Sequence, residues 1–198
     1  MCRNTRGTHL GSGTCRTRVA RDRVPYGLHQ QRGADTVTRI PAVGDVVGDF
    51  SLPGGQLTND AFVRGEYSLG AQRGNPVVLA FYPGDNTPVC TAQLCSYSDG
   101  LEALGACGAQ VWGISPQGVD SHESFASARG LRMPLLADTD RAVARAFGIT
   151  APLIGLRRAV FIVAPDGTLH WKHVAAVGMR FPSAELITEQ LVGVTAVG

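Results

Sequence analysis

Cysteine is scarce in this sequence, and its spacing fits neither a disulfide-rich scaffold nor a Cys-x-x-Cys site. Five cysteines occur among 198 residues, too few and too unevenly spaced for a disulfide-rich scaffold. No two of them are separated by only two residues, which excludes a thioredoxin-type dithiol and a zinc ribbon. A chain of this length has enough core to fold without disulfides, so we expect a reducing compartment.

Long apolar runs and a dominant charge are also lacking. No apolar stretch is long enough to span a bilayer, so no membrane segment is predicted. After residue 40 the chain has fourteen acidic and ten basic residues, and Lys172 is its single lysine. This mildly acidic composition argues against a nucleic-acid partner.

Residues 1–40 differ from the rest in holding eight arginines and two acidic residues without hydrophobic periodicity. They lack the apolar core of a secretory signal. We expect a disordered extension, or a start codon placed too far upstream. A transit peptide has the same composition, so organelle targeting stays open beside the default cytoplasmic location. Residues 41–198 are expected to form one domain.

Short apolar strands alternate with helices from residue 41 onward. Strands are predicted at 48–58, 76–82, 109–115, 158–163 and 168–174, the last two as an antiparallel hairpin. Helices are predicted at 88–106, 120–130, 138–148 and 183–193, with Asp120 or Ser121 as one N-cap and Gly130 as a stop. The expected fold class is α/β, a mixed sheet flanked by helices.

The stretch PGDNTPVC (83–90) places a thiol directly behind a cluster of helix breakers. Pro88 suits the first position of a helix, which makes Thr87 the N-cap and Cys90 the third helical residue. Unpaired N–H groups and the helix dipole favour a thiolate there. This placement predicts a reactive cysteine without specifying a catalyst.

The spacing Pro83-x-x-x-Thr87-x-x-Cys90, between a buried strand and a helix, resembles the active-site motif of the peroxiredoxins. These are thiol peroxidases with a thioredoxin-like fold. VVLAFYPGDNTPVCTAQLC (77–95) is similar to the subfamily called bacterioferritin comigratory protein, or PrxQ, and the resemblance covers residues 43–193. It implies hydroperoxide substrates, a thioredoxin-type reductant, a monomer, and neither cofactor nor metal.

The resemblance also implies roles for single residues. Cys90 is the peroxidatic cysteine, Thr87 hydrogen-bonds its sulfur and the peroxide, and Pro83 shields the thiolate from water. Arg158 stabilises charge as the O–O bond breaks, whereas Arg157 faces the other side of its strand. Without the motif, Cys90 would be core filler, Thr87 only a cap, and Arg158 a surface ion-pair partner.

Cys95 matches the resolving cysteine of many PrxQ-like proteins. In an intact helix, Cα atoms five residues apart are separated by roughly 8.7 Å, and a disulfide needs less than about 7 Å. The resemblance therefore implies that a Cys90–Cys95 disulfide forms only after the helix unwinds. The alternatives are a one-cysteine enzyme with Cys95 as a buried helix residue, and core packing for Cys107. Cys2 and Cys15 are either stray thiols or partners for another chain.

Some positions depart from the family pattern or invite other interpretations. Gln93 stands where glutamate is usual, Val89 where glycine is frequent, and 158–161 reads Arg-Ala-Val-Phe instead of Arg-x-Thr-Phe. The histidines of HWKH (170–173) would face opposite sides of a strand and make a poor metal pair. Asp138 and Asp140 are expected to cap a helix.

Two other functions stay open from the sequence. One is a redox sensor in which a Cys90–Cys95 switch changes partners without turnover. The other is a general thiol–disulfide oxidoreductase, disfavoured because no Cys-x-x-Cys occurs. Steady peroxide consumption would separate a peroxidase from a sensor, since a sensor stops after one oxidation.

Overall fold

A seven-stranded mixed sheet forms the centre of the computed structural model, which describes residues 39–195 except 60, 152–154 and 177–179. The strand order is β2-β1-β5-β4-β3-β8-β9, with β3, β4 and β5 parallel to one another. The strands are β1 (Ser51–Thr58), β2 (Ala61–Ser68), β3 (Val77–Phe81), β4 (Gln110–Ser115), β5 (Leu135–Ala137), β8 (Ala159–Val163) and β9 (Leu169–Val174). A separate antiparallel pair is formed by β6 (Thr150–Ala151) and β7 (Gly155–Leu156).

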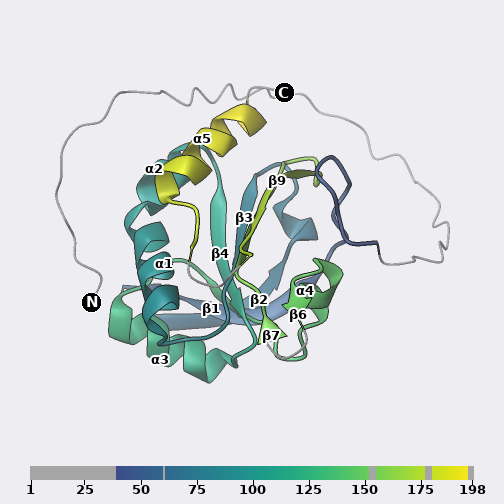
Figure 1. Cartoon of the computed structure of the whole chain (residues 1–198). Helices are drawn as coiled ribbons and strands as arrows, with labels where there is room; N and C mark the ends of the chain where they lie inside the picture. The colour runs from purple at the N-terminus through teal and green to yellow at the C-terminus, as the bar shows by residue number, and fades with distance from the viewer. Residues whose placement is uncertain (1–38, 60, 152–154, 177–179, 196–198) are drawn as a thin grey trace.

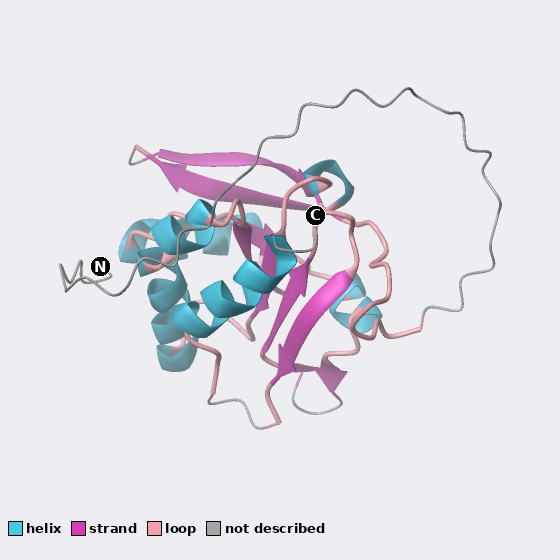
Figure 2. Ribbon diagram, turned by 90° about the horizontal axis from the view of Figure 1, so that it is seen from above, coloured by secondary structure: helices cyan, strands magenta, loops and turns pink. Residues whose placement is uncertain are grey.

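Helices cover both faces of the sheet, as the views from two directions show (Figures 1 and 2). They are α1 (Pro88–Asp99), α2 (Leu101–Ala106), α3 (Val119–Arg129), α4 (Ala142–Ala146) and α5 (Ala184–Thr195), with a short 3-10 helix η1 (Gly70–Gln72). Strand β3 is buried on both sides: Val78 and Ala80 pack with α1, α2, α3 and α5, whereas Leu79 and Phe81 pack with α4. The predicted α/β class is confirmed.

The long helix predicted at 88–106 is wrong in one respect, because it breaks at Gly100 into α1 and α2. A Cβ atom at Gly100 would lie 2.7 Å from the Cβ of Ala184 in α5, so only glycine permits this close approach. Cys90 and Cys95 stay together in the twelve-residue helix α1.

The sequence prediction missed the exposed strand β2 and the short strand β5. β2 pairs with β1 along its whole length but exposes most of its side chains, and β5 is buried but only three residues long. The predicted hairpin is present as β8 and β9, which pair antiparallel. The exposure of β2 and the shortness of β5 therefore explain why the sequence pattern did not indicate them.

Helix ends followed the prediction only in part. Gly130 ends α3 in the left-handed conformation, at φ 71°, but the N-cap is Gly118 and not Asp120 or Ser121. The helix predicted at 138–148 shortens to α4, whose N-cap residue is Arg141 and neither Asp138 nor Asp140, although both carboxylates accept hydrogen bonds from its first turn. The Asp138 carboxylate accepts from the N–H groups of Val143 and Ala144, at 3.2 and 2.8 Å, and that of Asp140 from the N–H of Ala142.

The segment leading into the domain is held at the surface beside β9. Arg39 forms an ion pair with Asp45 at 2.7 Å, and the Lys172 ammonium donates to the Pro41 carbonyl at 3.0 Å. The prediction for residues 1–40 otherwise concerns a part of the chain outside the described residues.

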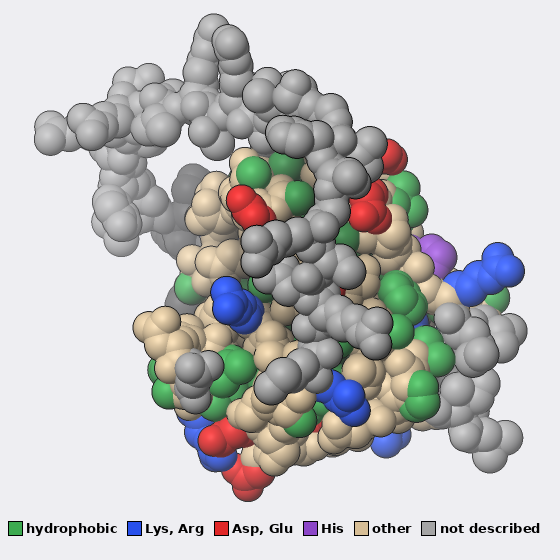
Figure 3. Space-filling view, turned by 90° about the vertical axis from the view of Figure 1, so that its left-hand side faces the viewer, with side chains coloured by type: hydrophobic (Ala, Val, Ile, Leu, Met, Phe, Trp, Pro, Cys, Tyr) green, Lys and Arg blue, Asp and Glu red, His purple; other side chains and the backbone are tan. Residues whose placement is uncertain are grey.

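On the face drawn in Figure 3, basic and acidic side chains lie among apolar ones. Within the residues that the structure describes, no helix combines the length and apolarity needed to cross a membrane.

Candidate active site

Cys90 lies at the start of α1, directly after the loop that leaves β3. Thr87 is the N-cap residue and Pro88 the first helical residue, which confirms the position predicted for the thiol. Cys90 is a free thiol with a relative exposure of 1%. Its sulfur therefore combines a helix N-terminus with almost complete burial.

Arg158 reaches Cys90 because β8 runs antiparallel to β3. Ala159 pairs with Phe81 at the end of β3, so the preceding residue lies beside the loop that leads to Cys90. The Arg158 Nη2 donates to the Cys90 Sγ at 3.3 Å, and the arginine side chain is buried. Arg157 points elsewhere, since its Nη2 donates to the Ala175 carbonyl at 3.0 Å. The structure thus brings a guanidinium charge onto the sulfur, as expected from sequence.

Gln93 and Tyr97 extend this contact along one face of α1. The fully buried Gln93 accepts through Oε1 from Arg158 Nη1 and donates through Nε2 to the Tyr97 hydroxyl at 3.4 Å. The Tyr97 hydroxyl in turn donates to the Pro182 carbonyl at 2.8 Å. Burial raises the pKa of Tyr97, so its hydroxyl keeps its proton.

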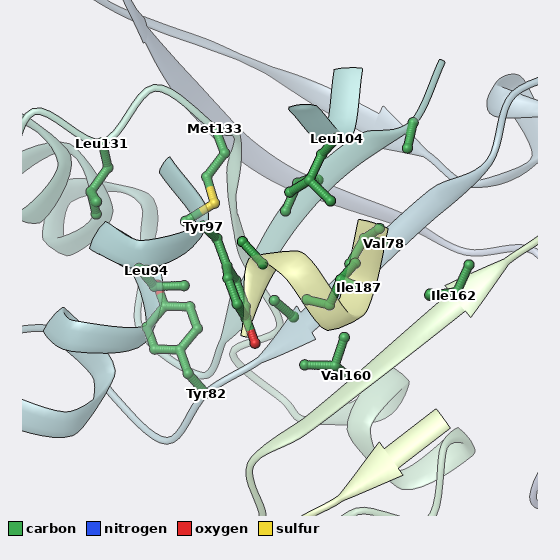
Figure 4. Packing of buried hydrophobic residues seen from close by; sticks show 14 of the residues in the cluster. Val78, Tyr82, Leu94, Tyr97, Leu104, Leu131, Met133, Val160, Ile162 and Ile187 are labelled. Atoms are coloured by element: carbon green, nitrogen blue, oxygen red, sulfur yellow. The ribbon is translucent and has the colours of Figure 1, made fainter. Parts of the chain in front are cut away.

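Tyr97 was missed from sequence, and Gln93 was noted only as a departure from the family. Their spacing of three and seven residues from Cys90 is that of one helix face, a signal that could have found them. Figure 4 shows Tyr97 among the buried side chains of this cluster, near Ile187 of α5 and Val78 of β3. These hydrogen bonds hold the Arg158 side chain in position through Gln93 and Tyr97.

Replacing Tyr97 by phenylalanine tests this anchoring. The variant leaves a buried carbonyl and a buried amide without their partner, so we expect a loss of about 1–3 kcal/mol in the free energy of unfolding. Urea denaturation measures it, with Tyr67→Phe as the matched control, because the Tyr67 hydroxyl has no hydrogen bond among the described residues. Equal stabilities of the two variants would contradict the anchoring.

Thr87 and Pro83 are both exposed at the surface of the loop. The Thr87 hydroxyl donates to the Gly84 carbonyl at 3.4 Å and forms neither a helix-capping bond nor, among the described contacts, a bond to Cys90. The structure places both residues in the loop that precedes Cys90. Their contacts with sulfur and peroxide remain predictions.

Cys95 lies half-buried in α1, and Cys107 lies in the core after α2. Core packing for Cys107 agrees with the prediction. Cys95 is disulfide-bonded, and its partner is not Cys90, which is a free thiol. With α1 continuous from Pro88 to Asp99, a bond between Cys90 and Cys95 would require the helix to open.

A second polar cluster next to the site was missed from sequence. The Asp85 carboxylate, in the middle of the 83–87 loop, accepts from the Tyr82 hydroxyl at 2.8 Å, the Ser121 hydroxyl at 2.6 Å and the His122 Nδ1 at 2.9 Å. Burial pushes the pKa of Asp85 upward, but these donors hold it below its ordinary value. The only sequence signal was DSH at 120–122, which we interpreted as a helix start.

Comparisons with known proteins agree with this geometry. The AhpC/TSA family matches residues 43–172. Peroxiredoxin Bcp of Xanthomonas campestris is 31% identical over 153 residues, covering 73% of this chain and 89% of that protein.

Two solved structures from the same organism superpose with a TM-score of 0.63. One is peroxiredoxin Q, 26% identical, with 73% of this chain and 91% of that chain covered. The other is bacterioferritin comigratory protein, studied for alkyl peroxide reduction and 25% identical, with 73% and 92% covered.

Proposed function

Because the chain belongs to the AhpC/TSA family and resembles its Bcp and PrxQ members, it is a thiol-dependent peroxidase with a thioredoxin-like fold, and we propose that Cys90 is its peroxidatic residue. The observation that carries this assignment is the guanidinium of Arg158, 3.3 Å from a buried sulfur at a helix N-terminus. A free thiol with a cation against it is the arrangement that favours a nucleophilic thiolate.

In the first step the Cys90 thiolate attacks one peroxide oxygen. The S–O bond forms as the O–O bond breaks, and the leaving oxygen departs as hydroxide or alkoxide and takes a proton to become water or an alcohol. Cys90 is left as the sulfenic acid. Arg158 donates to the reacting atoms as negative charge moves from sulfur to the leaving oxygen. Thr87 and Pro83 contribute, in this proposal, a donor to the peroxide and a wall against water.

In the second step Cys95 attacks the sulfur of the sulfenic acid as a thiol, so the disulfide that it forms in the structure must be reduced beforehand. The S–S bond forms, the S–O bond breaks and water leaves. Because α1 holds the two Cα atoms roughly 8.7 Å apart when intact, its first turns must unwind at this stage. A thiol reductant then reopens the disulfide and returns both cysteines to the reduced state.

The proposed substrates, reductant, oligomeric state and location follow from the same resemblance. Hydrogen peroxide and organic hydroperoxides are the proposed substrates, in line with the alkyl peroxide activity named for the Xanthomonas protein. Thioredoxin or a similar dithiol protein is the proposed reductant. We propose a monomer located in the cytoplasm, where a reducing environment keeps Cys90 as a thiol.

Steady turnover tests this proposal against the sensor alternative. With thioredoxin, its reductase and NADPH, we expect the wild-type protein to consume many equivalents of hydrogen peroxide. Cys95→Ser should keep the first oxidation at the wild-type rate but lose thioredoxin-driven turnover, because no resolving thiol remains. Consumption that stops after one equivalent in the wild type would identify a sensor. Unchanged turnover in Cys95→Ser would identify a one-cysteine enzyme.

A further inference from the structure

His122 lies fully buried under the loop that leads to Cys90, and both of its ring nitrogens face acceptors. Nδ1 lies 2.9 Å from a carboxylate oxygen of Asp85, and Nε2 lies 3.1 Å from the carbonyl oxygen of Leu136 in β5. A carboxylate and a backbone carbonyl have no proton to donate. Both hydrogen bonds are therefore made only when both ring nitrogens carry a proton, which is the imidazolium form.

We propose that His122, held as an imidazolium between Asp85 and the Leu136 carbonyl, is a positioning residue for the peroxidatic loop. This inference rests on the proposed role of Cys90 and adds a positioning element to that site. The cation joins three parts of the fold that are distant in sequence: the loop after β3, the helix α3 and the strand β5.

The loop depends on this anchor because three of its five residues, 83–87, are exposed. Pro83, Asn86 and Thr87 are exposed, and Asn86 adopts the left-handed conformation at φ 59°, which is uncommon for a residue other than glycine. The Asp85 side chain is 3% exposed and gives the loop a polar contact with the interior. Fixing Asp85 therefore fixes the path of the chain from β3 into α1, and with it the place of Thr87 and Cys90.

The charged groups around His122 place one carboxylate, that of Asp85, beside its ring. Asp85 and Tyr82, whose hydroxyl lies 3.5 Å from Nδ1, are the titratable groups within hydrogen-bond distance, and Cys90 packs in the same cluster as Tyr82. On α3 itself, Asp120 and Glu123 turn outward to form ion pairs with Arg64 of β2. The net low pKa of Asp85 agrees with a cation beside its carboxylate.

Loss of the second proton would leave a ring nitrogen lone pair against either the carboxylate or the carbonyl. One anchor of the loop would then be lost, and misplacement by a fraction of an ångström is enough to slow a reaction at a positioned nucleophile. Removal of one of these two contacts should accordingly slow the oxidation of Cys90 by hydrogen peroxide.

Two variants test the proposal through that oxidation rate. His122→Gln keeps one donor but not both contacts, so we expect the oxidation of Cys90 to be about tenfold slower, with the later reduction of the disulfide unchanged. Asp85→Asn removes the carboxylate that accepts from Nδ1, so it should slow the same step. His170→Gln, near the start of β9 and away from Arg158, is the matched control and should keep the wild-type rate.

Nitrogen-15 NMR of the wild-type protein provides a readout that does not depend on a variant folding. The chain has five histidines, and His122 is assigned by replacing the other four in turn. Because each ring nitrogen faces an acceptor, we expect both to carry a proton. A neutral tautomer there, or a His122→Gln oxidation rate equal to that of the wild type, would overturn the inference. Activity retained in Cys90→Ser would instead overturn the proposed function, so the two failures are distinguishable.

Discussion

Replacement of Cys90 by serine is expected to abolish peroxide reduction, with a loss of more than about a thousandfold, as removal of a covalent nucleophile produces in other enzymes. Serine is close to cysteine in volume, so the fit beneath the loop is retained and Arg158 keeps a polar partner. What disappears is the sulfur nucleophile that lies at the helix N-terminus beside the guanidinium. Peroxide consumption under single-turnover conditions measures the effect.

Cys107→Ser is the matched control for that variant, because Cys107 is a second buried cysteine, placed after α2 and away from α1's first turn. We expect it to keep the wild-type oxidation rate, with at most a modest loss of stability from the polar atom introduced into the core. A control as inactive as Cys90→Ser would mean that the loss reflects general damage to the fold. Full activity in Cys90→Ser would remove Cys90 from the mechanism.

Arg158→Ala should slow the oxidation of Cys90 by about a hundredfold to a thousandfold. The guanidinium contacts the sulfur at 3.3 Å, and its charge acts most strongly while electrons move toward the leaving oxygen. The loss should therefore appear in the rate constant for the reaction with peroxide and not in the later reduction of the disulfide. Stopped-flow measurement of the reduced protein with hydrogen peroxide separates the two steps.

The neighbouring arginine provides a close control. Arg157 carries the same charge one residue away, but its Nη2 donates to the Ala175 carbonyl, so Arg157→Ala should leave the oxidation rate within about threefold of the wild type. Arg158→Lys keeps the charge without the planar two-armed group that also reaches Gln93, and we expect an intermediate rate. Equal rates in Arg157→Ala and Arg158→Ala would show that the contact seen in the structure is not used in the reaction.

The parts of the fold that were predictable from sequence have unambiguous local signals. β3 and β4 are buried on both faces and appear as continuous apolar runs, and Pro88 and Gly130 mark helix ends by their own backbone chemistry. The exposed strand β2 carries no such signal and is held by its pairing with β1. β5 is buried but only three residues long, and it is held by pairing with both β1 and β4. The break at Gly100 depends on the approach of α5, which no local pattern contains.

The residues of the site also fall into those that could be predicted from sequence and those that could not. Cys90 and Arg158 were found because the motif and the strand order of a known family place them together. The contacts around them depend on long-range packing: Tyr97 bonds to a carbonyl 85 residues away, and Asp85 bonds to a histidine 37 residues away. Nothing in the sequence assigned His122 a role beyond packing, since DSH at 120–122 was interpreted only as a helix start. Its two acceptors become visible only when β5 and the loop are placed around it.

The central claim, that Cys90 reacts with peroxide and is resolved by Cys95, is tested most directly by one oxidation experiment. The fully reduced protein is treated with one equivalent of hydrogen peroxide, and the product is mapped by mass spectrometry. The account predicts a loss of two hydrogens per chain and a peptide in which Cys90 is linked to Cys95, which requires that α1 has opened. An unmodified Cys90 after consumption of the peroxide would contradict it.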